Sequence, residues 1–197
     1  MGIPAQFMNE VMEQSAEDLY AELKRGAADL PNTDLLARML ASQKAGEGEM
    51  PERLGLTAKQ FPAMMNRHFP RIRVDAYGLG EELDLSRAPE REELRGLLVN
   101  NASEDIPADE QAWMADIIIA GCMGGNHLWQ DLGLWSRKDL SALINQNFTE
   151  LAKKNDRDMK WKKFLYKQLC NAEGVYTCRA PSCEVCDDFN ACFGSEE

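Results

Sequence analysis

Four of the six cysteines in this chain of 197 residues lie within fifteen residues near its carboxyl end, separated by four, two and five residues. They are Cys178, Cys183, Cys186 and Cys192. Thiolate sulfur is a soft ligand that selects zinc or iron–sulfur clusters over the hard cations that prefer oxygen. Pro181 and Ser182 favour a turn between the first two cysteines, so the loop can fold back and bring four thiolates to one centre. The spacing therefore predicts a metal site.

The intervals between these cysteines favour one kind of metal site over another. Structural zinc sites usually pair two short Cys-x2–4-Cys motifs across a longer insert, whereas iron–sulfur loops often place several ligands in one close run. This run is of the second kind, although it does not reproduce the common ferredoxin spacings. Iron–sulfur binding is therefore favoured, while zinc, disulfides and free thiols remain open alternatives.

The two remaining cysteines and the two histidines are the candidates for further ligands. Cys170 could add a ligand, but a small buried core residue is the favoured interpretation, and the same holds more strongly for Cys122 in an apolar segment. His127 follows a Gly-Gly break, where its side chain could point into a site, although a hydrogen-bonded structural histidine is favoured. His68 is expected only to end a helix. Possible additional metal ligands are thus Cys170 and His127.

Composition limits the class of protein and its partners. The chain is 44% hydrophobic and 28% charged, which is ordinary for a soluble globular domain long enough to bury a core. A net charge of −11 argues against binding to nucleic acid or to an anionic membrane. No stretch approaches the length of a membrane span, and the first residues lack a secretory pattern. We therefore expect a cytoplasmic protein, in which close cysteines bind metal more readily than they form disulfides.

Apolar residues recur at helical rather than strand spacing along the chain. This pattern predicts an all-α bundle of about six to seven helices with a C-terminal Cys-rich metal-cluster loop. We expect a helical body over residues 1–174 and a cluster-binding loop over 175–197, packed on the body in a single domain. Residues 71–89 should be irregular, with an extended segment at 72–77. The expected helices span about 6–25, 33–45, 58–69, 89–98, 108–123, 137–154 and 157–173.

Several local features support these helices. Thr57 with Gln60, and Ser136 with Asp139, fit capping boxes at two helix starts. The segment 108–123 is apolar on more than one face and should be the central core helix. The expected core residues are Trp113, Ile117, Ile118, Leu140, Ile144, Trp161 and Leu165. Four lysines should form a solvated basic surface that could offset the charge of an anionic cluster or dock an acidic partner; they are Lys160, Lys162, Lys163 and Lys167.

Two stretches of the chain resemble a known family. Residues 159–170, Met-Lys-Trp-Lys-Lys-Phe-Leu-Tyr-Lys-Gln-Leu-Cys, are followed by the four cysteines and by Phe-Gly at 193–194. This pattern looks like the C-terminal signature of the NifQ family. The segment His127 to Leu134 also resembles that family, and the match covers about residues 121–194.

The resemblance implies a nitrogen-fixation accessory protein. It implies a molybdenum–iron–sulfur cluster carrier that donates molybdenum for the nitrogenase iron–molybdenum cofactor, with the nitrogenase cofactor-assembly scaffold and nitrogenase reductase as partners and molybdate or another molybdenum source as supplier. The resemblance also implies which residues bind the cluster, namely Cys178, Cys183, Cys186 and Cys192.

Two other functions remain open from the residues alone. One is a small iron–sulfur electron carrier, and the other is a zinc-stabilised protein-interaction module. The sequence has no Gly-rich phosphate loop, no His-Glu-x-x-His motif and no nucleophile elbow, so we do not expect an enzyme.

Overall fold

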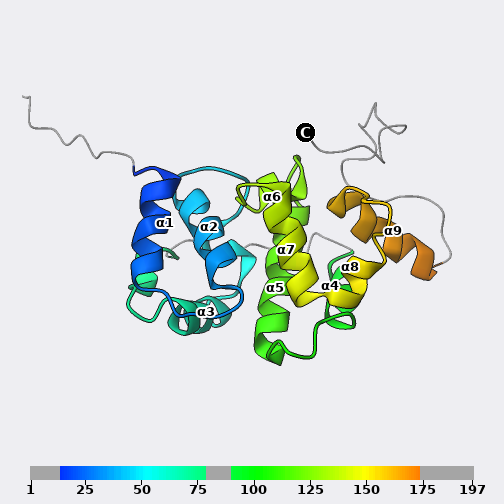
Figure 1. Ribbon diagram of the computed structural model, residues 1–197, viewed down its shortest axis with the longest axis horizontal. Helices are drawn as coiled ribbons and strands as arrows, with labels where there is room; N and C mark the ends of the chain where they lie inside the picture. Colours follow the sequence, from blue (N-terminus) through cyan, green and yellow to red (C-terminus); the bar gives the residue numbers. More distant parts are fainter. Residues whose placement is uncertain (1–13, 79–89, 174–197) are drawn as a thin grey trace, which may run out of the picture.

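The structure is a computed structural model that describes residues 14–78 and 90–173, and all regular secondary structure in these two ranges is helical (Figure 1). Nine α-helices occur there, seven of them nine to fifteen residues long, which confirms the all-α prediction. None of them is long and apolar enough to cross a membrane. They are α1 (Ala16–Arg25), α2 (Thr33–Lys44), α3 (Gln60–His68), α4 (Arg91–Val99), α5 (Ala108–Cys122), α6 (Leu128–Asp131), α7 (Arg137–Asn147), α8 (Thr149–Lys153) and α9 (Trp161–Glu173).

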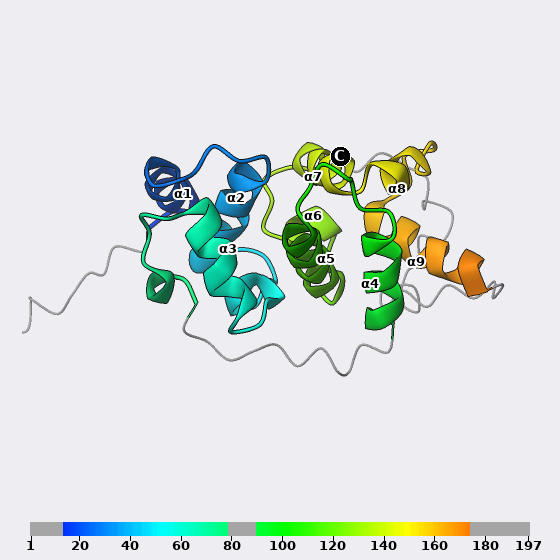
Figure 2. The same cartoon turned by 90° about the horizontal axis from the view of Figure 1, so that it is seen from below.

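Helix α5 lies at the centre of the fold. Figures 1 and 2 show α1, α2 and α3 on one side of it and α4, α8 and α9 on the other. Eleven of its fifteen residues are buried, as expected of a helix that is apolar on several faces. The seven predicted core residues are at most 5% exposed. The sequence pattern therefore identified both the central helix and these core residues.

The capping box predicted at Thr57 is present, and the Ser136 hydroxyl caps α7 as predicted. The Thr57 backbone N–H donates to Gln60 Oε1 (3.0 Å), and the Gln60 N–H donates to Thr57 Oγ1 (3.2 Å). At α7, the hydroxyl of Ser136 accepts from the Asp139 N–H at 3.2 Å. These side chains satisfy amide groups that a helix start leaves without intrahelical partners.

The predicted helix at 137–154 is divided into α7 and α8 at Phe148, whose φ and ψ of −138° and 55° are not helical. A neighbouring loop explains the break. The Ser103 N–H donates to the Asn147 carbonyl (2.8 Å), and the Thr149 N–H donates to Ser103 Oγ (3.3 Å). Hydrogen bonds to Ser103 thus replace the backbone hydrogen bonds that would continue the helix. The Phe148 side chain at the break is fully buried.

Three further predictions differ from the structure in detail. The last helix begins at Trp161, because Asp158 has a positive φ of 51° and the Asn155 side chain bonds both the N–H and the carbonyl of Met159. The segment predicted as extended at 72–77 instead contains a 3-10 turn, η3 (Val74–Ala76), so that prediction was wrong. The first helix begins at Ala16 after its Ser15 cap, and its predicted start at residue 6 lies outside the described residues.

A second 3-10 turn, η2 (Glu52–Gly55), packs against α5. Arg53, Leu54 and Gly55 all have positive φ, at 63°, 54° and 78°. Only glycine fits at the third position, because a Cβ there would lie 2.4 Å from the Cβ of Ala120. This close approach joins the α1–α3 side of the molecule to the central helix.

Candidate functional site

The four cysteines of the predicted cluster loop all lie in residues 174–197, outside the described residues. The predicted domain boundary at 174–175 lies there as well. The last described element is α9, and the four cysteines follow it in the sequence (Figure 1). In the two described ranges, no three His, Cys, Asp or Glu side chains come together in a group that could hold a metal ion. The thiolate site therefore stays a sequence prediction, and the structure describes what precedes it.

Lys162, in the first turn of α9, is buried rather than solvated. Its side chain is 8% exposed, and its ammonium donates to Asp131 Oδ2 (2.5 Å), the Gly124 carbonyl (2.8 Å) and the Asn126 carbonyl (3.1 Å). Three acceptors match the three donors of an ammonium group. The prediction that Lys162 belongs to the solvated basic surface was therefore wrong. Lys160 and Lys163 are half-buried, and Lys167 is exposed.

Asp131, at the end of α6, organises the turn that follows α5. Its side chain is fully buried, and both carboxylate oxygens lie 3.2 Å from the backbone nitrogen of Asn126, which donates to them. A Cβ on Gly124 would lie 2.4 Å from the carboxylate carbon, so only glycine allows this approach. We call Gly124, Asn126, Asp131 and Lys162 the ion-pair clasp, which joins the end of α5, α6 and the start of α9.

His127 lies within the turn that the clasp holds. It is the N-cap of α6, in a capping box with Gln130: the His127 N–H donates to Gln130 Oε1 (3.2 Å), and the His127 side chain faces the Gln130 backbone N–H. The link predicted at 126–134 thus contains one turn of helix. Cys170, half-buried on α9, lies eight residues beyond Lys162, which is about two helical turns along the axis.

Cys122 is the last residue of α5 and is only 1% exposed. Burial raises the pKa of its thiol to about 12, with a smaller lowering by the Lys162 ammonium and a raising by the Asp131 carboxylate. The thiol is therefore protonated at neutral pH. As predicted, Cys122 is a core residue.

A second group of buried polar residues lies away from α9, and sequence reasoning missed it. The Asn32 amide donates to Glu110 Oε1 (2.6 Å) and to Asn147 Oδ1 (2.8 Å), and all three residues are nearly or fully buried. Asn32 is the N-cap residue of α2, but its side chain makes no cap bond. The sequence does not single out Glu110, because Asp109 and Gln111 beside it are polar too and acidic residues are common in a first helical turn.

His68 belongs to this group and is fully buried, although it had been expected only to end a helix. It does end α3, and its Nδ1 lies 2.8 Å from Thr33 Oγ1, while its Nε2 lies 3.6 Å from Glu110 Oε1. Burial lowers the pKa of His68 and outweighs the raising effect of the Glu110 carboxylate; the nearby Arg67 lowers it further. His68 is therefore a structural residue of the α2–α3–α5 contact.

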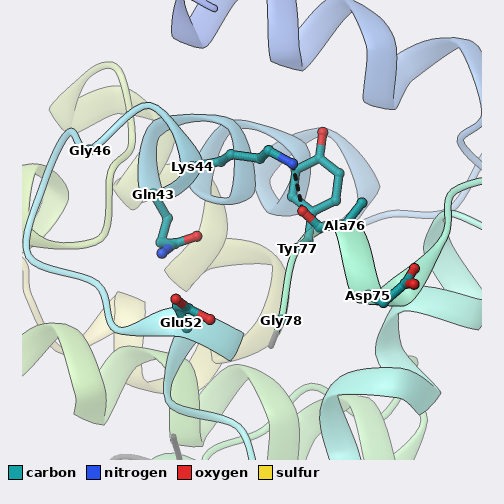
Figure 3. Close-up of a pocket in the computed structure, with 8 residues that line it drawn as sticks. All are labelled: Gln43, Lys44, Gly46, Glu52, Asp75, Ala76, Tyr77 and Gly78. Carbon is teal, nitrogen blue, oxygen red and sulfur yellow. Dashed lines mark hydrogen bonds between the residues drawn. The ribbon is translucent and has the colours of Figure 1, made fainter. Parts of the chain in front are cut away.

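A pocket of about 410 Å³ opens between the end of α2, η2 and η3 (Figure 3). On one wall, Lys44 Nζ donates to the Ala76 carbonyl (2.5 Å) and lies 4.4 Å from the centre of the Tyr77 ring. Gln43 and Glu52 face each other across it in Figure 3. The lining contains no cysteine or histidine, so it does not offer the soft ligands of the predicted metal site. Its residues are Gln43, Lys44, Gly46, Glu52, Asp75, Ala76, Tyr77 and Gly78.

Comparisons with known proteins cover both the described helices and the cysteine loop. The family model described as NifQ matches residues 35–194. Protein NifQ of Azotobacter vinelandii is 42% identical over 179 residues, covering 85% of this chain and 91% of that protein. Protein NifQ of Klebsiella pneumoniae is 36% identical over 172 residues, covering 83% of this chain and 99% of that protein.

A third relative, the Protein NifQ homolog of Sinorhizobium fredii (strain NBRC 101917 / NGR234), is 39% identical over 163 residues, covering 83% of this chain and 70% of that protein. No solved structure matches the chain. The family match extends over most of the chain, and it includes the turn at 124–131, α9 and the four cysteines. The chain belongs to the NifQ family.

Proposed function

We propose that this protein carries a molybdenum–iron–sulfur cluster on Cys178, Cys183, Cys186 and Cys192 and donates molybdenum for assembly of the nitrogenase iron–molybdenum cofactor. The observation that carries the proposal is the run of four closely spaced cysteines, which lies inside the range matched by the NifQ family model. Thiolates at such intervals suit iron–sulfur chemistry. The NifQ family is one of nitrogen-fixation accessory proteins, which gives this chemistry its context.

The cluster is cargo in this proposal. In a cuboidal cluster with one molybdenum, bridging sulfides do not complete the coordination of the molybdenum, so it needs a further exchangeable ligand from protein, water or an oxyanion. Transfer would begin at that position. The described helices bury a continuous core, in which no three His, Cys, Asp or Glu side chains form a group that could hold a metal ion, so the body can fold without its cargo.

The first experiment measures what the protein holds. Protein isolated anaerobically should be brown and contain iron, acid-labile sulfide and molybdenum, as shown by elemental analysis and electron paramagnetic resonance. Replacing any one loop cysteine by serine should lower the cluster content strongly. Cys122→Ser is the matched control, because that thiol is buried and protonated. Colourless protein with one zinc per chain would instead support the interaction module.

The second experiment separates a donor from an electron carrier. Loaded protein is mixed anaerobically with the cofactor-assembly scaffold and nitrogenase reductase under reducing conditions, the proteins are separated, and molybdenum is counted in each. A donor loses molybdenum to the scaffold. Retention of all molybdenum by this protein, with electrons still exchanged, would refute the donor proposal and support the electron carrier.

A further inference from the structure

Hydrogen bonds connect the walls of the pocket between the end of α2, η2 and η3 (Figure 3). The Lys44 ammonium donates to the Ala76 carbonyl (2.5 Å) and so joins α2 to η3. Arg53 Nε donates to the Gly78 carbonyl (3.2 Å) and joins η2 to the chain after η3. A Cβ on Gly46 would meet no atom within 4 Å, so the entrance there is open. A ligand would therefore enter a formed pocket of about 410 Å³, a volume typical of small-molecule sites.

Two polar side chains in this pocket have no partner among the residues that the structure describes. Gln43 belongs to α2 and Glu52 to η2, and they face each other in Figure 3. Neither side chain makes a hydrogen bond or an ion pair within residues 14–78 and 90–173. A carboxylate only accepts hydrogen bonds, and the amide oxygen of Gln43 accepts them as well. The two side chains together are therefore suited to a group with several N–H donors, such as an ammonium.

Lys44 supplies the opposite charge from another wall of the pocket. Its Nζ bonds the Ala76 carbonyl and lies 4.4 Å from the centre of the Tyr77 ring, and among the described residues it forms no ion pair with Glu52. An ammonium has three donors, and Ala76 accepts from one of them. The remaining donors suit an anionic oxygen. The two opposite charges thus line one pocket without pairing with each other.

We infer that this pocket binds a small zwitterion of the amino-acid class, with its ammonium on Glu52 and Gln43 and its carboxylate on Lys44. Hydrogen bonds to charged groups are about twice as strong as neutral ones, so both ends of such a ligand contribute. Asp75, the other carboxylate of the lining, does not compete, because it is paired with Arg73. The inference is independent of the proposed function, since it involves neither the cysteines nor a metal.

The first test compares zwitterions with ligands that carry a single charge. NMR of the full chain follows the Gln43 side-chain amide and the Gly46 N–H during titration with glycine or γ-aminobutyrate. Methylamine and acetate are the single-charge controls for glycine, and butylamine and butyrate are those for γ-aminobutyrate. The Asn145 amide on α7 is the reference signal, because it lies outside the pocket lining.

At least one zwitterion should shift the pocket signals saturably, with a Kd on the order of 1 mM for a ligand of so few atoms. Its two single-charge controls should bind about tenfold more weakly, because each loses one set of charged hydrogen bonds. No saturable shift with either zwitterion up to about 10 mM would overturn the inference. An amine that binds as tightly as the matching zwitterion would show a simple cation site and overturn it too.

Glu52→Gln tests the ammonium contact without changing the shape of the side chain. It should weaken binding of the zwitterion about tenfold. Glu49→Gln is the matched control, because Glu49 is also exposed and belongs to the same connection between α2 and η2 but does not line the pocket. Both side chains are exposed, so neither variant should change the thermal midpoint measurably. Equal weakening in the two variants would show a general effect of charge and overturn the contact with Glu52.

Lys44→Met tests the carboxylate contact. It should weaken binding of the zwitterion about tenfold and should not weaken binding of the matching amine, which has no carboxylate. Lys44 also connects two walls, so the amine reports whether the pocket has lost its shape. Equal weakening of the zwitterion and the amine would show that Lys44 only holds the wall, and would overturn its assignment as the carboxylate partner. These measurements need no bound metal, so they do not depend on whether the chain carries a cluster.

Discussion

Asn32→Ala should be among the most destabilising single substitutions in this protein. The Asn32 side chain is fully buried and joins helices far apart in sequence. Its amide nitrogen donates to Glu110 Oε1 (2.6 Å) and Asn147 Oδ1 (2.8 Å), and its amide oxygen accepts from the side chains of Asn147 (2.8 Å) and Gln146. Alanine removes all four bonds and leaves the partners buried or half-buried.

The magnitude follows from the groups left without partners. A buried polar group that loses its hydrogen bond costs about 1–3 kcal/mol, and a charged one costs more. The Glu110 carboxylate would keep only the more distant Arg67 and His68, at 3.6 Å each. Together with the Asn147 amide, this gives a loss of about 3–5 kcal/mol in the free energy of unfolding. For a chain of this length, that loss lowers the thermal midpoint by about 10 °C.

The assay is urea unfolding of the metal-free chain, followed by helical circular dichroism. We expect a lower midpoint with an unchanged slope, since the surface exposed on unfolding hardly changes. Asn145→Ala on α7 is the control, because its exposed amide bonds only the Ser141 carbonyl, and it should change stability by less than about 0.5 kcal/mol. Equal midpoints for the two variants would refute the reasoning.

Three other predictions concern pH, thiol reactivity and metal removal. Because burial holds the pKa of His68 in the folded protein below its unfolded value of about 6.5, the free energy of unfolding should be highest above that pH and should fall as the pH drops below it. His68→Gln should reduce this loss of stability at low pH. A pH profile of unfolding that this variant leaves unchanged would contradict the assignment. With a pKa of about 12, Cys122 should react with iodoacetamide at pH 8 only after unfolding, as measured by peptide mass spectrometry, and rapid labelling of the folded chain would show that the thiol is accessible. Chelation of a bound cluster should leave most helical circular dichroism intact, because the described helices bury their core without a group of side chains that could hold a metal ion. Loss of most of the signal would show that the body and the loop fold as one unit.

Most helices could be predicted from sequence because each carries its own periodic apolar stripe and local end signals. Helix α5 and the caps at Thr57 and Ser136 are examples in which the decisive interactions lie within a few residues. The break at Phe148 could not be predicted in the same way. It depends on Ser103, which is 45 residues away in sequence and bonds the backbone on both sides of the break.

The site could be predicted only in part, and for the same reason. Lys162 belongs to a lysine-rich run, which is typical of a solvated surface, yet helical spacing places it in line with the buried Leu165, Tyr166 and Leu169 at three, four and seven residues. This helical spacing indicates that Lys162 lies on the buried face of α9. Its partner Asp131 is 31 residues away, so no local pattern could have paired them. The cysteine spacing, in contrast, is entirely local and is visible in sequence without any fold.

The two buried polar groups differ in what they join, and this difference supports separate roles for them. The group around Asn32 connects α2, α3, α5 and α7, so it fixes how the helices of the body pack. The clasp connects the end of α5 and α6 to the start of α9. A change in the first group should therefore act on stability alone. A change in the clasp should in addition change how α9 is held against the turn at 124–131, because all three acceptors of the Lys162 ammonium belong to that turn.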